Sequence, residues 1–557
     1  MNRQNSILLI LIWIGGLLLR ILPGLLYGHP FVLDSWIHTH KAEEILRTGV
    51  IQFATGDYDS YWPMVEIYIA VLAIITHTTP YFVATYIFPA TISIVIPISF
   101  LLFRKILNDD RMAIYASSFI AFAGPYVFHT SGVTKETLAH PLLLAGFYFW
   151  IQMHDGRAKF IKNFIGFLVI SLLMLPTHHI TLLMFLIPLP IFSIISLFDE
   201  SNLNSKIRVF LYDIFAFVVL GVLFILYYFI LGTFTVLPKD PLFGKSILNE
   251  SFILNFLGFY GLMLFYGIHI RVNKKPPMSI RNTFPLISGL TLGVLSTLLF
   301  IQIFPFIQID VHFIIDILPF ALLLIFSGYG FSYMRSNQTK FQKYHGFDFV
   351  ISLSMSYVAF LLFAMFSGRT SLNLVLLTRG TTFLIIAFAI VASAGIFYFY
   401  RSFKISKRLH YLVLTFMIVL PLFSGYMYID GTVMGEKYFG AGNIFSQTEL
   451  EGFQWINSTI PKDAVIASDM RVHYVLSGYY GYTVNITDAE NFLVDGAFYL
   501  SSDYLVVTKE MKTQGFLFGV GLQWQEIPPD RFNLINSLLW LHLVYSNNDI
   551  WIYEVIH

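Results

Sequence analysis

Residues 17–49 read LLLRILPGLLYGHPFVLDSWIHTHKAEEILRTG and pass from an apolar run into a polar helical pattern. The run that ends near Tyr27 is long enough to cross a bilayer, which takes about 20 apolar residues. The next segment has apolar residues at helical spacing and ends at Gly49, so it predicts an amphipathic helix with Asp34 or Ser35 as its N-cap. The pattern therefore places the Asp34 carboxylate at the membrane–water boundary, as a helix cap or as a functional acid.

The composition sets the class of the protein. Hydrophobic residues make up 56% of the 557 residues and charged residues only 12%, which is typical of a polytopic membrane protein. The net charge of +1 gives no indication of nucleic acid as a partner. The absence of cysteine excludes disulfides, thiolate metal sites and cysteine nucleophiles. No small-residue cleavage motif follows the first apolar run, so we expect an uncleaved first helix.

Apolar runs of spanning length predict about 13 transmembrane helices. They lie near residues 6–27, 80–103, 112–128, 137–153, 161–176, 181–198, 209–232, 251–271, 285–305, 313–334, 348–367, 380–400 and 410–428. Residues 28–79 form the first external loop, in which the short segment 62–78, with Glu66, is predicted not to span. With this assignment the clusters of Lys and Arg fall on one side, so the N-terminus is predicted to be cytoplasmic. A spanning segment at 62–78 would invert every later loop.

The composition changes after residue 428, and residues 429–557 are predicted to form a small external α/β domain. We expect a helix at 448–460 and strands at 464–468, 503–508 and 549–555. Residues 1–428 are then the transmembrane domain. The expected fold class is an α-helical polytopic protein of the plasma membrane with a soluble C-terminal domain on the outer face.

Ionisable side chains gather where the predicted external loops meet the membrane, where charges are costly unless they pair or serve function. The candidates are Arg20, Asp34, His38, Lys135, Glu136, His178, His179, Asp310, Arg369 and Arg379. Arg379 precedes a Gly-Thr-Thr sequence that predicts a helix start, a geometry suited to phosphate binding.

Structural roles for several of these residues remain open. Lys135 and Glu136 stand at the start of a span, where lysine can reach water and glutamate favours the helix dipole. His178 and His179 fill a short hairpin and could simply be solvated. Arg20 could pair with Asp34 or Glu66 as well as with a phosphate.

A metal site is a further open alternative. Asp34 and His38 are four residues apart and share a helix face. A divalent ion, Mg²⁺ or Mn²⁺, held by Asp34, Glu136 and a histidine is consistent with the sequence, but no spacing requires it. We therefore expect no cofactor to be required.

Several short motifs resemble the catalytic subunits of oligosaccharyltransferases, which belong to the GT-C class of polyprenyl-phosphate-dependent glycosyltransferases. They are Leu19-Arg-Ile-Leu-Pro, Asp34-Ser-Trp-Ile-His, Tyr61-Trp-Pro, Ser131-Gly-Val-Thr-Lys-Glu-Thr-Leu-Ala, Leu377-Thr-Arg-Gly-Thr-Thr-Phe, and the helix–turn–strand sequence at 451–468. In the resemblance, Asp34 matches the catalytic, metal-binding aspartate of the first loop.

The sequence also departs from that family. Lys135, Glu136 and Thr137 stand where the family has an acidic or Asp/His metal pair, and the fifth loop is reduced to about residues 305–312. Asp469-Met-Arg-Val-His stands where the family has WWDYG, which reads the Ser/Thr of a sequon. We therefore do not expect sequon recognition.

The resemblance and the residues together predict a membrane glycosyltransferase that uses a polyprenyl-phosphate or dolichyl-phosphate donor and an acceptor on the outer face. Asp34 and Glu136 are the expected catalytic acids. Lys135, Arg379, Arg369 and Arg20 are the expected phosphate ligands. His38, His178, His179 and Asp310 are secondary candidates. The alternatives are a divergent oligosaccharyltransferase paralogue, a transporter or flippase of lipid-linked sugars, and a non-catalytic scaffold.

Overall fold

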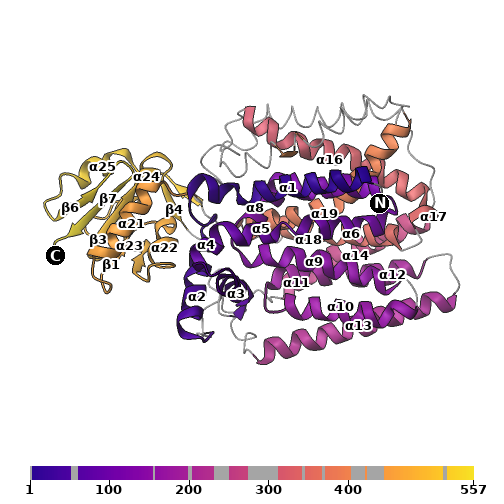
Figure 1. The fold of residues 1–557 in the computed structure, drawn as a ribbon. Helices are drawn as coiled ribbons and strands as arrows, with labels where there is room; N and C mark the ends of the chain where they lie inside the picture. The colour runs from indigo at the N-terminus through magenta and orange to yellow at the C-terminus, as the bar shows by residue number, and fades with distance from the viewer. Residues whose placement is uncertain are drawn as a thin grey trace.

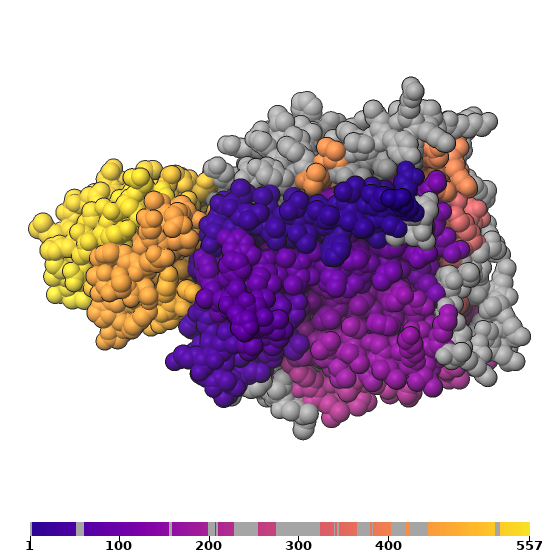
Figure 2. Space-filling model, in the orientation of Figure 1, coloured from indigo at the N-terminus to yellow at the C-terminus, as the bar shows by residue number. Residues whose placement is uncertain are grey.

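The computed structural model describes residues 3–51, 61–154, 157–198, 203–230, 250–273, 311–341, 345–366, 370–402, 419, 421–422, 444–518 and 523–557. These residues form a helical body with an α/β domain at one end, and the N-terminus lies at the other end (Figure 1). The space-filling view in Figure 2 shows the domain against the indigo-to-violet N-terminal part of the chain. The predicted boundary at residues 428 and 429 lies outside the described residues.

Apolar helices of different lengths build the body. They are α1 (Arg3–Tyr27), α6 (Val95–Leu107), α7 (Asp110–Phe122), α9 (Lys135–Met153), α10 (Arg157–Met174), α11 (His179–Leu186), α12 (Pro188–Ser196), α13 (Leu203–Ile230), α14 (Glu250–Val272), α16 (Val311–Ser336), α18 (Gly346–Phe366) and α19 (Thr370–Ser402), with the short α17 (Gln338–Phe341). Among the described residues, six helical stretches are long and apolar enough to cross a membrane, starting at Arg3, Pro80, His179, Phe210, Gly346 and Thr382. The chain is therefore a multi-pass membrane protein, and the predicted spans at 285–305 and 410–428 fall wholly or largely outside the described residues.

The described part of the first predicted external loop contains the helices α2 (Asp34–Thr48) and α3 (Met64–Thr76). Both lie at the end of the body next to the α/β domain (Figure 1). The 13 residues of α3 rise about 20 Å, which is short of the hydrocarbon core of about 30 Å. This length agrees with the prediction that segment 62–78 does not span.

Helix α2 corrects one expectation. It begins at Asp34, and the capping position is held by Leu33, which has helical torsion angles and no side-chain capping bond. The prediction that Asp34 or Ser35 caps the helix is therefore wrong. A sharp backbone turn at Val32, with φ of 65°, starts the helix without a polar cap.

Two spans near α1 are interrupted. The stretch from Pro80 contains α4 (Pro80–Phe82), a π-helical turn (Val83–Ile87) and α5 (Phe88–Ile92) before α6. The close approach of α1 requires Gly24, since a Cβ there would lie 2.5 Å from the carbonyl oxygen of Thr85. The next span is broken at Ala123, which is extended, and continues as α8 (Gly124–Ser131).

The C-terminal domain is α/β, as predicted. Its sheet has the order β2-β1-β3-β7-β6, with the β1 pairs parallel and the β7 pairs antiparallel. The strands are β1 (Val465–Ala467), β2 (Thr483–Asn485), β3 (Tyr504–Thr508), β6 (Leu541–Ser546) and β7 (Ile550–Val555), beside the separate pair β4 (Phe516–Phe518) and β5 (Gln523–Gln525). The helices are α21 (Gln447–Thr459), α22 (Met470–Leu476), α23 (Ile486–Leu493), α24 (Lys509–Thr513) and α25 (Pro529–Ile535). The four elements predicted from the sequence are confirmed as α21, β1, β3 and β7.

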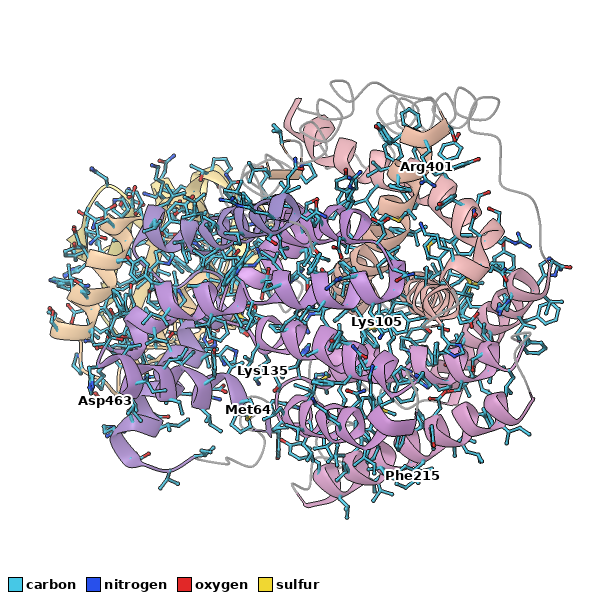
Figure 3. All side chains as sticks on the ribbon, turned by 45° about the vertical axis from the view of Figure 1, so that its right-hand side comes forward. Met64, Lys105, Lys135, Phe215, Arg401 and Asp463 are labelled. Atoms are coloured by element: carbon cyan, nitrogen blue, oxygen red, sulfur yellow. The ribbon has the colours of Figure 1, made fainter. Side chains whose placement is uncertain are left out.

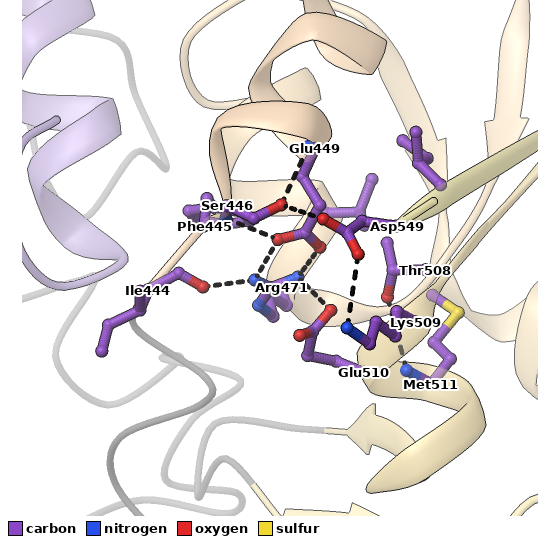
Figure 4. A network of polar contacts seen from close by, with 12 residues as sticks. Ile444, Phe445, Ser446, Glu449, Arg471, Thr508, Lys509, Glu510, Met511 and Asp549 are labelled. Carbon is purple, nitrogen blue, oxygen red and sulfur yellow. Dashed lines mark hydrogen bonds and ion pairs between the residues drawn. The ribbon is translucent and has the colours of Figure 1, made fainter. Parts of the chain in front are cut away.

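A buried ionic network joins these elements (Figure 4). The Arg471 guanidinium lies 2.5 and 2.9 Å from the two carboxylate oxygens of Glu449 and 3.7 Å from Glu510. The pKa of Arg471 is raised mainly by the Glu449 carboxylate, against the opposing effect of burial. Burial raises the pKa of Glu510 to about 7, so this second acid is readily neutralised. The network ties α21, α22 and α24 together.

Candidate active site

The Glu136 side chain is the centre of a buried charged cluster. It lies in the first turn of α9, which Thr134 caps by accepting a hydrogen bond of 3.1 Å from the Thr137 amide. The Oε2 atom of Glu136 lies 3.4 Å from Nε of Arg379, and its Oε1 atom lies 3.5 Å from Nε2 of His140. Both oxygens thus face groups that carry or can carry positive charge.

Arg379 extends the cluster to the loop before α11. Its Nη1 atom donates a hydrogen bond of 3.2 Å to Nε2 of His178. The Nδ1 atom of the same ring caps α11: it accepts a bond of 3.3 Å from the Thr181 amide and lies 2.8 Å from the Thr181 hydroxyl. His178 is 3% exposed, so the alternative of a solvated hairpin is wrong for this residue.

Lys135 lies against an aromatic wall. Its Nζ atom is 5.6 Å from the ring centroid of Trp62, and the Trp62 and His179 rings are 4.8 Å apart. A hydrogen bond of 3.4 Å from the Met64 amide to the Pro176 carbonyl holds the first and third loops together. Figure 3 labels Lys135 and Met64 close together, with Lys105 and Arg401 toward the other end of the body. Three loops distant in sequence therefore meet around Lys135.

The turn before α2 brings Asp34 to the second loop. Val133 donates an amide hydrogen bond of 2.9 Å to the hydroxyl of Ser35. Gly132 packs on Val32 so closely that a Cβ would lie 2.4 Å from the valine Cγ2. A β-branched residue with positive φ is strained and persists only where its surroundings hold it. This packing fixes the start of α2 beside the segment that leads into Lys135 and Glu136.

The Asp34 carboxylate is half-buried and has no hydrogen-bond or ion-pair partner within the described part of the chain. One turn later, His38 makes a buried pair with Glu66, with Nδ1 2.8 Å from Oε1. The two side chains are 4% and 2% exposed. His38 therefore links α2 to α3 and is not paired with Asp34.

The structure does not bring all the predicted residues together. Arg20 is fully buried and donates hydrogen bonds to the carbonyls of Gly16, Ala121 and Ile120, at 2.9, 3.2 and 3.1 Å. The last two carbonyls belong to the final turn of α7, which has no continuing helix to satisfy them. Arg20 contacts neither Asp34 nor Glu66. Asp310 and Arg369 lie outside the described residues.

Arg379 also differs from its prediction. Helix α19 begins at Thr370, so Arg379 lies within the helix and not before its start. Its position is set by Glu136 and His178 and not by a helix N-terminus. Trp62 and His140 were not assigned to the site from the sequence, although His140 follows Glu136 at the i,i+4 spacing that places two side chains on one face.

A divalent metal ion at Glu136 would face the side chains that already surround this carboxylate. The described residues contain no group of three or more His, Asp or Glu side chains arranged to hold one. Both Glu136 oxygens already face Arg379 and His140, and Lys135 adds a further cation nearby in the chain. Arg379 and Lys135 therefore place cationic side chains near Glu136.

The segment at residues 469–473 is part of the domain interior. Asp469 and Arg471 are fully buried, and Asp469 caps α22 by accepting a bond of 3.0 Å from the Val472 amide. Burial raises the pKa of Asp469 to about 6. These two side chains serve the fold of the domain and do not present an acceptor-binding surface.

No family model matches the sequence, and no curated protein matches it. Solved structures of the archaeal oligosaccharyltransferase AglB from Archaeoglobus fulgidus are similar to the chain over most of its length. The complex with an inhibitory peptide and a dolichol-phosphate has a TM-score of 0.52 at 14% identity and covers 91% of this chain and 70% of that one. The form tethered to an acceptor peptide with an NVT sequon has a TM-score of 0.55 at 11% identity, with coverages of 92% and 70%.

A third structure of the A. fulgidus enzyme, in complex with Zn and sulfate, has a TM-score of 0.55 at 14% identity and covers 91% of this chain and 68% of that one. At these identities the likeness concerns the fold. The chain thus has the fold of the oligosaccharyltransferase-type GT-C membrane glycosyltransferases.

Proposed function

We propose that this protein is a membrane glycosyltransferase that takes a sugar or glycan from a polyprenyl-phosphate-linked donor. The acceptor would be used on the side of the membrane where the C-terminal domain lies. One observation carries the proposal: Arg379 pairs with Glu136, the neighbour of Lys135, and Ser35 ties the start of α2, with Asp34, to the segment that leads into them. The fold and the dolichol-phosphate bound by one structural neighbour support this class of donor.

The cations supply a subsite for the phosphate. Arg379 and Lys135 are the cations proposed for this subsite, and Glu136 pairs with Arg379. Glu136 and His178 hold the guanidinium from two sides. A fixed guanidinium makes strong charge-assisted bonds to phosphate and does not need to reorganise as the leaving group gains charge.

Asp34 is the proposed general base. Its carboxylate would accept the proton of the acceptor hydroxyl or amine as the acceptor atom bonds to the anomeric carbon. The bond from that carbon to the phosphate oxygen breaks, and its electron pair leaves with the lipid phosphate. Arg379 and Lys135 would stabilise this negative charge. No step depends on a metal ion or another cofactor.

The acceptor would not be selected by a sequon. The residues at 469–473 are committed to the domain core through Asp469 and Arg471, which favours an acceptor other than the Asn-x-Ser/Thr peptide. The orientation proposed from the basic loops puts the C-terminal domain outside. The N-terminus lies at the opposite end of the body from that domain, which is consistent with this orientation (Figure 1).

The test is transfer from labelled donors. The full chain in lipid nanodiscs would be incubated with a panel of radiolabelled polyprenyl-phosphate sugars and a membrane and protein extract of the native cells. We expect label to move from the lipid to an extract component with at least one donor. Asp34→Asn should abolish transfer while the protein stays folded, since the two side chains have the same shape. Absence of transfer with every donor, or normal turnover by Asp34→Asn, would contradict the proposal.

A further inference from the structure

Helix α2 belongs to two hydrophobic cores at once. Leu33 and Trp36 lie within the core of the C-terminal domain, although more than 400 residues separate them from it in the chain. Trp36 is 2% exposed, and its ring meets Phe445 and Tyr479 edge-on at 5.7 and 5.5 Å between centroids. The Trp36 side chain is therefore buried within the hydrophobic core of the C-terminal domain.

Polar and close-packed contacts extend this junction along the helix. The Tyr479 hydroxyl donates a bond of 3.1 Å to Oε1 of Glu43, about two and a half turns from the start of α2. Ile37 packs directly on Gly478, where a Cβ would come within 2.6 Å of its Cγ1. Figure 2 shows the C-terminal domain against this N-terminal part of the chain.

Other side chains of α2 bind the helical body. Ser35 accepts the Val133 amide bond, and His38 pairs with Glu66 of α3. Because successive residues of a helix point about 100° apart, these residues face the body while Trp36, Ile37 and Glu43 face the domain. Asp34 lies in the first turn, between the two sets of contacts.

We propose that Trp36 is a positioning residue, through which the C-terminal domain holds the first turn of α2 and therefore Asp34 in its reactive place. This inference rests on the proposed function, in which Asp34 takes the proton of the acceptor. The turn before α2 contains the strained Val32, which needs its surroundings to hold it. Without the indole, α2 loses its largest side chain in the domain core and keeps only the Ile37 and Glu43 contacts there, so its first turn can shift. A displacement of about 1 Å at a reacting group can cost about 100-fold in rate.

Trp36→Ala tests the role, with Trp455→Ala as the matched control. Trp455 stacks on Tyr545 within the same domain, with 4.8 Å between ring centroids, so its loss weakens the domain core without removing a side chain of α2. For Trp36→Ala we expect a fall in kcat of about 10- to 100-fold, with an unchanged KM for the lipid donor. Hydrogen exchange at the α2 amides should become faster. Trp455→Ala should leave kcat and the α2 amides near the wild-type values, and Trp36→Phe should recover most of the rate.

The absence of cysteine from the chain allows a rescue experiment. Glu43→Cys and Tyr479→Cys, introduced into Trp36→Ala, can be bridged by a bis-methanethiosulfonate reagent about as long as the two lost side chains. We expect the bridge to restore protection of α2 and most of kcat, and dithiothreitol to reverse both. Near-normal kcat in Trp36→Ala, equal losses in Trp455→Ala, or a complete bridge without rescue would overturn the proposal. If the wild-type protein transfers no sugar, the exchange measurements still test the positioning of α2 separately from the proposed function.

Discussion

Glu136 and Arg379 form an ion pair, with Oε2 of the carboxylate 3.4 Å from Nε of the guanidinium, although they come from α9 and α19. The glutamate side chain is 4% exposed, so its charge depends on this partner and on His140. The two oxygens of this buried carboxylate face a guanidinium and an imidazole. In the proposed function, its role is to orient the cation that would bind the lipid phosphate.

Replacing Glu136 by Gln should therefore weaken binding of the lipid donor and also lower the stability of the folded protein. Loss of one partner of a buried ion pair costs about 3–5 kcal/mol, so the melting temperature should fall. The KM for the lipid donor should rise because Arg379 loses its support, and Glu136→Asp should retain part of both properties. Thermal unfolding in nanodiscs and donor-concentration series measure the two effects. An unchanged KM in a folded Glu136→Gln protein would contradict the orienting role.

Lys135 distinguishes fixed-charge chemistry from metal-assisted chemistry. A divalent ion about 4 Å from the lysine charge would face a repulsion of about 8 kcal/mol at an effective dielectric of 20. We expect transfer to persist in excess EDTA, to collapse in Lys135→Ala and to survive in part in Lys135→Arg. Initial rates with and without chelator provide the measurement. Activity that is sensitive to EDTA but tolerates Lys135→Ala would reveal a metal site.

The buried Asp469 predicts a pH-dependent contribution to the stability of the C-terminal domain. Burial raises its pKa from 3.8 to about 6, so the folded state binds this proton more tightly than the unfolded state. Stability is therefore lost as the pH rises through 6. Asp469→Asn, which can still cap α22, should stabilise the domain less at pH 5 than at pH 8. Hydrogen exchange of the β1 and α22 amides in the full chain measures this, with exposed Asp463→Asn as the control. Equal effects of Asp469→Asn at both pH values would contradict the prediction.

Arg20 should matter for the fold and not for the donor. Arg20→Met removes hydrogen bonds to the carbonyls of Gly16, Ile120 and Ala121, and each bond to a charged group contributes about 1.5–3 kcal/mol. The melting temperature should fall, while the KM for the lipid donor in the remaining folded protein should stay at the wild-type value. A raised KM with normal stability would restore Arg20 as a phosphate ligand.

The sequence by itself determined the class of the fold, because the signals for it are local. Apolar runs of spanning length define membrane helices wherever they occur, and segment 62–78 is too short for one. Strands such as β3 and β7 were predicted because their β-branched and aromatic residues are contiguous. The position of Asp34 at the start of an amphipathic helix followed from the same local pattern, although its exact place in the first turn did not.

Only the tertiary structure decided the partners. Arg379 pairs with Glu136, and Arg20 donates hydrogen bonds to carbonyl oxygens at the end of α7. Trp36 packs in the core of the C-terminal domain. The two partners in each case lie about 100 to 400 positions apart in the chain. The local sequence around either residue is compatible with several other partners. The choice depends on which helix ends meet when the body packs and on the cost of leaving a buried charge or carbonyl without a partner. The periodicity of one segment predicts neither which helix ends meet nor the free-energy cost of an unpaired buried group.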